Sequence, residues 1–293
     1  MTRLDPANYE RIDLHTHSTC SDGTLAPAAL VALAATRQVQ LLALTDHDTT
    51  AGCTEARQAC LAHGIAFLEG IELTALWHEC EVHIVALGIR ADDPGLQQHA
   101  AAVRALRGER VRRIAARLSE AGLDGESLAA GAFALSTVPT RTHLARALLA
   151  AGHAKDLQGA FDKWLGRGRP GYVAPEWPDV ATTLTAVLGA GGTAVLAHPH
   201  RYKLSNTALR ELCAQFKADG GAALEVSIAG MSPDSQARMA QLARRFDLAG
   251  SIGSDFHEPG LPWRPLGRFA KLPEAVTPVT ACLGLGPANV EKQ

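Results

Sequence analysis

Histidine and carboxylate side chains recur at the ends of short apolar runs in this chain, and this recurrence restricts the possible folds more than any other feature of the sequence. Seven β-type runs are present, namely RIDLHTH, QLLALTDHD, IAFLEGIEL, VHIVALGI, TAVLAHPH, AALEVSI and LAGSIGSDFH. Buried imidazoles and carboxylates are costly unless a metal ion or a charged partner satisfies them. The pattern therefore favours a fold that brings the ends of many strands together at one site.

Helix-like segments separate several of these runs, including residues 27–38, 54–63 and 233–246. Strands that alternate with helices predict a parallel α/β sheet, and seven strands predict a barrel or near-barrel. In such barrels, functional side chains gather at the C-terminal ends of the strands. This is where the candidate ligands stand in most of the runs.

The pattern changes between residues 92 and 177, where strand-like runs almost vanish. Residues 96–121 form an arginine-rich stretch that predicts a long helix, and residues 139–152 predict a second one. The GRGRPGYVAPEWP segment reads as the loop that returns to the barrel. We therefore expect a small helical domain at 96–177, inserted between a first barrel part at 10–95 and a second barrel part at 178–275.

Charge and hydropathy exclude several classes of partner. The formal net charge is −2, from 28 lysines and arginines against 30 aspartates and glutamates, so no strongly basic surface is expected for long nucleic acid or for a membrane. The first residues, MTRLDPANYERIDL, lack the apolar core of a signal peptide, and no later stretch reaches the roughly 18 uncharged apolar residues of a membrane span. The six cysteines form no CxxC pair. We expect a cytoplasmic protein with a small-molecule ligand and no obligate protein partner.

Two pairs of candidate metal ligands have members two residues apart. Alternate side chains of a strand share a face, so His15 and His17 present two imidazoles on one side of the first run. Asp255 and His257 repeat this arrangement in GSDFH. Five further candidates stand singly at or near other runs, namely Asp22, His47, Glu72, His83 and His198. So many coincident positions predict a metal site.

The donor types narrow the choice of metal. Oxygen and nitrogen ligands without thiolate fit manganese, iron or zinc, and the general order of affinities does not choose among them. Three other carboxylates, Asp46, Asp48 and Glu225, are expected to lie outside the ligand set. There they would orient ligand imidazoles by hydrogen bonds or act as structural groups.

These segments resemble the PHP superfamily, named for polymerase and histidinol phosphatase domains. The order of the motifs matches from His15 to His257, over most of the chain apart from the insertion. The resemblance implies a distorted (β/α)7 barrel of PHP type with two or three divalent ions. It favours manganese, with zinc or iron as alternatives.

The resemblance also implies three ligand sets. One ion would bind His15, His17, Glu72 and Asp255, a second would bind Glu72, His83 and His198, and a third would bind Asp22, His47 and His257. Glu72 would thus bridge two ions. The third set departs from members of the family that have a histidine where Asp22 stands.

A more detailed resemblance is to the branch that contains nucleoside 3',5'-bisphosphate phosphatases and a short-RNA exonuclease. It rests on LHTHSTCSDGTLAP, ALTDHDT, AHPHRY, GSDFH, TRTHLARAL and FDKWLGRGRPGYV. It implies hydrolysis of the 3'-phosphate of a nucleoside 3',5'-bisphosphate to a 5'-monophosphate and phosphate. Four alternatives stay open: 5'-3' exonuclease activity on short RNA, another small-molecule phosphatase such as one for histidinol phosphate, hydrolysis of a C–N bond, and a non-catalytic metal-binding module.

The expected charges at the site suit phosphate. Three divalent cations would outweigh the carboxylates of Glu72, Asp22 and Asp255, so a dianionic substrate would be favoured. Bound metals lower the pKa of water to about 7. A metal-bound hydroxide held by the Glu72, Asp255 and His198 ligands would attack phosphorus in line.

Candidate substrate ligands follow from their places in these motifs. Arg201 follows the AHPH segment, and Arg141 and His143 stand in the TRTH motif of the expected insertion. Such side chains would bind a second phosphate by charge-assisted hydrogen bonds. Weaker candidates in the insertion and its return loop are Lys163, Arg169, Tyr172 and Trp177.

Overall fold

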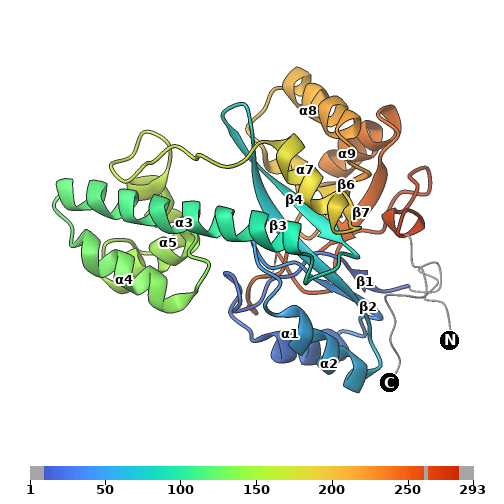
Figure 1. The fold of residues 1–293 in the computed structure, drawn as a ribbon, viewed down its shortest axis with the longest axis horizontal. Coiled ribbons are helices and arrows are strands. Elements are labelled where there is room, and N and C mark those ends of the chain that lie inside the picture. The colour runs from blue at the N-terminus through green and yellow to red at the C-terminus, as the bar shows by residue number, and fades with distance from the viewer. Residues whose placement is uncertain (1–9, 261–262, 284–293) are drawn as a thin grey trace.

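The computed structural model describes residues 10–260 and 263–283 of the chain. Within them, seven strands form one sheet in the order of the sequence. Their bounds are β1 Ile12–Asp13, β2 Leu41–Leu44, β3 Ala66–Trp77, β4 Cys80–Leu87, β5 Thr193–Leu196, β6 Ala223–Ile228 and β7 Ala249–Gly253. The sheet nearly closes into a barrel with helices around it, as the sequence predicted (Figure 1).

The sheet is mixed, so the prediction of an all-parallel sheet is wrong at β4. Strand β4 runs antiparallel to both β3 and β5, whereas the other neighbouring pairs are parallel. Only His78 and Glu79 connect β3 to β4. So short a connection permits a hairpin, because a parallel pair needs a crossover of about a dozen residues or more.

The chain beyond β1 and β7 closes the barrel. The Leu14 N–H donates to the Ile252 carbonyl at 3.3 Å, and the Asp255 N–H donates to the His15 carbonyl at 2.9 Å. Gly253 permits this approach, because a Cβ there would lie 2.6 Å from the His15 Cβ. The two ligand pairs therefore lie beside each other although about 240 residues separate them in the sequence.

Apolar side chains from all seven strand regions fill the barrel. The interior cluster includes Leu14, Leu41, Ala43, Leu68, Val85, Leu87, Val195, Ala197, Ala223 and Ala249. Five helices pack outside it: α1 Pro27–Thr36, α2 Cys53–His63, α7 Val180–Gly189, α8 Asn206–Ala218 and α9 Pro233–Arg245. Helices α1 and α2 cover one side, and α7, α8 and α9 cover another (Figure 1). Two 3-10 turns complete the barrel part of the described residues, Pro199–Arg201 after β5 and Val279–Ala281 after β7.

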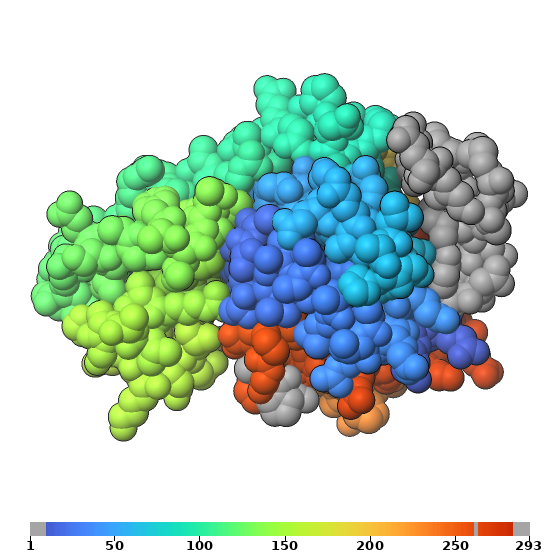
Figure 2. Space-filling model, turned by 90° about the horizontal axis from the view of Figure 1, so that it is seen from below, coloured from blue at the N-terminus to red at the C-terminus, as the bar shows by residue number. Residues whose placement is uncertain are grey.

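The remaining helices project to one side of the barrel (Figures 1 and 2). They are α3 Pro94–Glu120, α4 Gly125–Leu135, α5 Arg141–Ala150, α6 Leu157–Ala160 and a π-helix at Phe161–Leu165. Leu96 and Ala100 of α3 join a barrel cluster, whereas Ile114 and Leu118 join a separate cluster with α4 and α5. One continuous helix thus carries the chain from the barrel to the helical segment. The domain boundaries at 96 and 177 stay a prediction.

In the described part of the chain, none of the helices is both long enough and apolar enough to span a membrane.

Candidate metal centre

The two sequence pairs meet at the C-terminal ends of β1 and β7. His15 and His17 follow β1, and their Nε2 atoms lie 3.1 Å apart. The Oδ1 atom of Asp255, which follows β7, lies 3.6 Å from His15 Nε2 and 3.4 Å from His17 Nε2. All three side chains are buried. His15, His17 and Asp255 therefore lie together where the chain after β1 meets the chain after β7.

Glu72, on β3, lies at the middle of the cluster. Its Oε2 atom is 3.2 Å from Nε2 of both His15 and His17, and its Oε1 atom is 2.9 Å from His83 Nδ1. Oε1 is also 3.0 Å from His198 Nε2. The antiparallel hairpin explains the contact with His83, because Thr74 pairs with His83 and Glu72 is therefore its diagonal neighbour on the same face.

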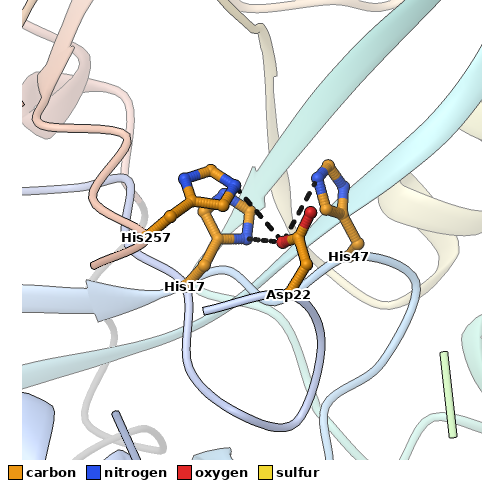
Figure 3. A group of neighbouring side chains, drawn as sticks. All are labelled: His17, Asp22, His47 and His257. Carbon is orange, nitrogen blue, oxygen red and sulfur yellow. Dashed lines mark ion pairs between the residues drawn. The ribbon is translucent and has the colours of Figure 1, made fainter. Parts of the chain in front are cut away.

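Asp22 collects a second group of imidazoles (Figure 3). Its Oδ1 atom lies 3.2 Å from His257 Nε2, 3.9 Å from His17 Nδ1 and 3.9 Å from His47 Nε2. One ligand atom from each of these four side chains lies within 4.8 Å of the others. His47 also reaches Glu72 Oε2 with its Nδ1, at 3.1 Å.

The structure brings all nine predicted ligands together. It differs from the three predicted sets because two of the imidazoles each belong to two groups of neighbouring ligand atoms. His17 belongs to the group of His15 and Glu72 and also to the group of Asp22. His47 likewise joins Asp22 in one group and Glu72 with His83 in another. A neutral imidazole offers one acceptor nitrogen. Each of these two rings can therefore serve only one ion in that form, and the assignment of ligands to individual ions stays a prediction.

The donor atoms fit divalent cations. Four buried atoms in the cluster lack a hydrogen-bond partner: Asp22 Oδ1, His47 Nδ1, Glu72 Oε2 and His198 Nδ1. Buried polar atoms normally have partners, so this concentration of unsatisfied atoms fits a site that binds cations. Imidazole nitrogens and carboxylate oxygens suit manganese, iron and zinc.

Without metal, protons would balance the negative charge of the cluster. Burial raises the pKa of Glu72, but His47 and His15 hold it well below its usual range. Burial lowers the pKa of His17 and of His83, but hydrogen bonds from His17 to Asp255 and Glu72 raise its pKa to about 9, and the charge of Glu72 raises that of His83 to about 10. Divalent ions would replace these protons, so metal binding should release protons.

The three carboxylates predicted outside the ligand set divide into two roles. Glu225 Oε1 lies 2.7 Å from His15 Nδ1, so it orients a candidate ligand as predicted. Asp46 instead accepts hydrogen bonds from Ser18 and Ser21, and thus shapes the loop before Asp22. Asp48 binds Thr74 and Arg107. For Asp46 and Asp48, the structure shows the structural role and no hydrogen bond to an imidazole among the described contacts.

Two of the ligand positions have left-handed backbones. His198 has φ 31° and Asp255 has φ 51°. L-residues rarely adopt this region, and such strain persists mainly where the surrounding structure enforces it, often at functional sites. Both positions therefore have the backbone strain that is common at functional sites.

A cleft of about 110 Å³ opens beside the cluster, between the barrel and the helical segment. Its walls include Asp22, His47 and His83 from the cluster, together with residues of α3 and α5. Arg141 is one of these residues, and its Nη2 atom donates to Glu81 at 3.0 Å. The structure thus places this predicted substrate ligand beside the metal centre.

Glu81, on β4, is a residue that the sequence analysis missed. It accepts hydrogen bonds from Arg110 Nη1 at 2.7 Å and from Trp177 Nε1 at 2.8 Å, in addition to that from Arg141. Burial raises its pKa, but Arg141, His83 and Arg110 hold the pKa well below its usual range. Its sequence signal is weak, because it lies two residues before His83 and just outside the apolar VHIVALGI run.

The other predicted substrate ligands lie in different surroundings. His143 is the N3 residue of a capping box, in which its Nδ1 accepts from the Thr140 N–H at 2.9 Å, so one of its ring nitrogens is used to begin α5. Arg201 ends the 3-10 turn after β5 and donates to Asp255 Oδ2. Arg264 also approaches this oxygen, at 3.4 Å, and the sequence analysis missed it.

The weaker candidates are spread more widely. Trp177 lines the cleft, where the guanidinium groups of Arg107 and Arg110 lie 5.4 and 5.2 Å from its ring centre. Lys163 lies over Trp164 at 4.7 Å. Arg169 and Tyr172 hydrogen-bond to the backbone within the return loop. Of these four, the structure places Trp177 at the cleft.

Known proteins resemble this chain over most of its length. The PHP domain family matches residues 13–226. Two curated relatives are each 41% identical: a 3',5'-nucleoside bisphosphate phosphatase of Chromobacterium violaceum, which aligns over 92% of this chain and 94% of its own length, and the 5'-3' exoribonuclease Rnm of Escherichia coli, which aligns over 93% and 94%.

Two solved structures share the fold. An amidohydrolase from Chromobacterium violaceum, with bound sulfate and no metal, has a TM-score of 0.88 and 40% identity over 93% of this chain and 95% of that chain. A protein named as a metal-dependent phosphoesterase from Bifidobacterium adolescentis has a TM-score of 0.75 and 32% identity, over 92% and 93%. These similarities confirm the predicted PHP-type barrel.

Proposed function

The chain belongs to the PHP domain family and is a metal-dependent phosphoesterase; from that premise we propose that it removes the 3'-phosphate of nucleoside 3',5'-bisphosphates. The products would be a nucleoside 5'-monophosphate and inorganic phosphate. The relative named as a bisphosphate phosphatase supports this choice of substrate. The position of Arg141 in the cleft also supports a substrate with two phosphates.

We propose that the buried cluster binds two or three divalent ions, with manganese as the native ion. The ligands would be His15, His17, Asp22, His47, Glu72, His83, His198, Asp255 and His257. When bound, such ions supply a nucleophilic water of lowered pKa and positive charge beside the phosphate oxygens. The two oxygens of Glu72 face different imidazoles, which suits a carboxylate that bridges two ions.

Arg141 is the single observation that favours a bisphosphate. Its guanidinium lines the cleft beside Asp22, His47 and His83, and Glu81 engages only its Nη2 atom among the described hydrogen bonds. The side chain is 35% exposed, so its other donors remain available to an anion. A phosphate that is not cleaved would thus find a cation here while the scissile phosphate lies at the cluster. Arg201 and His143 complete the proposed substrate ligands.

Exonucleolytic cleavage of short RNA is the second candidate. The relative named as a 5'-3' exoribonuclease has the same identity to this chain as the bisphosphate phosphatase. The chemistry would be the same, because a terminal 5'-phosphate could also bind at Arg141 while a 3'-phosphodiester lies at the cluster. In both reactions the 3'-oxygen of a 5'-nucleotide leaves, so the two candidates differ in whether the site admits a nucleotide chain on the phosphate that is attacked.

A panel of substrates tests the proposal. Phosphate or nucleotide release is measured with manganese-loaded protein for adenosine 3',5'-bisphosphate, adenosine 3'-monophosphate, histidinol phosphate, and short RNA with a 5'-phosphate. We expect the highest kcat/KM with the bisphosphate. A higher value with the RNA would replace the first candidate with the second, and a preference for histidinol phosphate would rule out both.

A further inference from the structure

Two arginines approach one oxygen of Asp255 at the edge of the metal centre. Asp255 Oδ1 faces His15, His17 and His257, whereas Oδ2 accepts a hydrogen bond from Arg201 and lies 3.4 Å from Arg264 Nη1. The two arginines come from separate segments, the 3-10 turn after β5 and the chain that follows β7. The carboxylate therefore separates the imidazole cluster on one side from two guanidinium groups on the other.

The second guanidinium exceeds what Asp255 needs. One arginine suffices to orient a carboxylate and to balance its charge, and Asp255 also faces three imidazoles. Each guanidinium side chain is 29% exposed, and Asp255 is the only ion-pair partner of either one within residues 10–260 and 263–283. The pair thus places two guanidinium groups against one carboxylate oxygen, and among the described contacts each engages Asp255 through its Nη1 atom alone.

We propose that Arg201 and Arg264 together bind the phosphate that is cleaved, with Arg264 as a substrate-binding residue. The guanidinium group presents its donors in a planar fork that matches a phosphate, and it stays charged at every physiological pH. The proposal rests on the proposed function in one respect, namely that a phosphate ester lies at the metal centre. It assigns the two sides of the centre different tasks, since Arg141 would bind the phosphate that is retained. Arg201, which the sequence predicted to bind the second phosphate, is thereby assigned to the cleaved one because it contacts Asp255.

Binding of inorganic phosphate tests this assignment directly. Phosphate is one of the products, and it can be titrated calorimetrically into manganese-loaded protein. We expect Arg264→Ala to weaken phosphate binding by about ten- to hundredfold, as for loss of a charge-assisted hydrogen bond. Arg264→Lys should recover only part of this loss, because an ammonium keeps the charge without the fork.

Arg268→Ala is the matched control. Arg268 belongs to the same C-terminal segment, but it lines a different pocket with Arg11 and Ile252, whose lining includes none of the candidate ligands. This variant should bind phosphate as the wild type does. The metal content of every variant is measured as well, because Arg264 could act by holding Asp255.

The outcomes separate the possibilities. Unchanged phosphate affinity in Arg264→Ala overturns the proposal, and so does a parallel loss of metal, which would make Arg264 a positioning residue for Asp255. If phosphate binding is lost at full metal content while no bisphosphate is hydrolysed, the assignment of Arg264 stands and the proposed substrate fails. If the bisphosphate is hydrolysed and Arg264→Ala binds phosphate normally, the reverse holds.

Discussion

The metal centre and the cleft beside it are built from charged residues in different ways. In the centre, Glu72 alone lies within 3.2 Å of five imidazole nitrogens, and most of the ligand side chains are buried, on the barrel strands or just after them. In the cleft, Glu81 pairs with Arg110, Arg141 and Trp177, and these groups come from a hairpin strand and the helical segment. The centre needs metal to satisfy its atoms, whereas the network around Glu81 is already satisfied by protein.

Because of this difference, we expect the metal centre and the cleft to have different roles. A cluster that depends on metal supplies the phosphoesterase chemistry, and its residues cannot change singly without leaving buried charges unpaired. A network that is complete without metal can vary at its exposed arginines and still fold. We therefore expect changes in the centre to abolish turnover and changes in the cleft to alter the choice of substrate.

Removal of metal should have the largest effect. Chelator-treated protein is expected to lose all measurable phosphatase activity and to recover it with manganese, since the cluster has no other source of a nucleophile. Elemental analysis of active protein should find two or three divalent ions per chain. A single ion in fully active protein would contradict the bridging position of Glu72.

Loss of the Glu72 carboxylate should have the second largest effect on activity. We expect Glu72→Gln to lower kcat by on the order of a thousandfold or more, because metal ions contribute several kcal/mol of transition-state stabilisation. His17→Ala should behave similarly, with the fold retained by circular dichroism. Glu69→Gln is the control, because Glu69 lies on the same strand and pairs with Arg57 outside the centre. Near-normal activity in Glu72→Gln would refute the ligand assignment.

The cleft should show a smaller, substrate-dependent effect. Arg141→Ala should lower kcat/KM for adenosine 3',5'-bisphosphate by about ten- to hundredfold, because it removes a charge-assisted contact of about 1.5 to 3 kcal/mol. Binding energy at the retained phosphate would also position the scissile one, so kcat should fall together with affinity.

Measuring kcat/KM of wild type and Arg141→Ala for adenosine 3'-monophosphate as well gives a double cycle. For this substrate, Arg141→Ala should lower kcat/KM only slightly. Arg113→Ala is a suitable control, since Arg113 lies on α3 and pairs with the exposed Glu176. Equal losses on both substrates would falsify a role for Arg141 in recognising the second phosphate.

The smallest expected effect is on the stability of the fold in acid, and it should arise from the ion pairs of Glu81 in the cleft. The folded-state pKa of Glu81 lies well below its ordinary value of 4.5, so its ion pairs stabilise the fold above about pH 4.5 and lose this contribution as the pH falls through the folded-state pKa. Unfolding of chelator-treated wild type and Glu81→Gln is compared at pH 7 and below pH 4.5. We expect Glu81→Gln to be less stable at pH 7, and the difference to shrink in acid.

Glu79→Gln serves as the control for this comparison, because Glu79 lies in the turn of the same hairpin and its pair with Arg167 is exposed. Exposed pairs contribute about 1 kcal/mol at most. A difference between wild type and Glu81→Gln that does not change with pH would show that the carboxylate charge is not what stabilises the cleft.

Much of the centre could be predicted from local spacing. His15 and His17 are two residues apart, and this spacing predicted that both imidazoles lie on one side of the first run. Asp255 and His257 have the same spacing, but the left-handed backbone of Asp255, with φ 51°, could not be predicted from it. The alternation of strands and helices likewise predicted a barrel, and the sequence order of the motifs predicted the family. These features depend on residues that are close in sequence, so periodicity records them.

The tertiary structure alone decided which distant residues share a partner. Arg141 and Glu81 are 60 residues apart, and Arg201 and Asp255 are 54 apart, so no local pattern could pair them. The antiparallel pairing of β3 with β4 places Glu72 beside His83. At the start of α5, a capping box uses one ring nitrogen of His143. Arg264 belongs to no motif, and the path of the chain after β7 brings its guanidinium back to Asp255. Such contacts depend on how far a side chain extends from one packed element to the next. Local sequence patterns predict only which helix or strand each segment can form by itself.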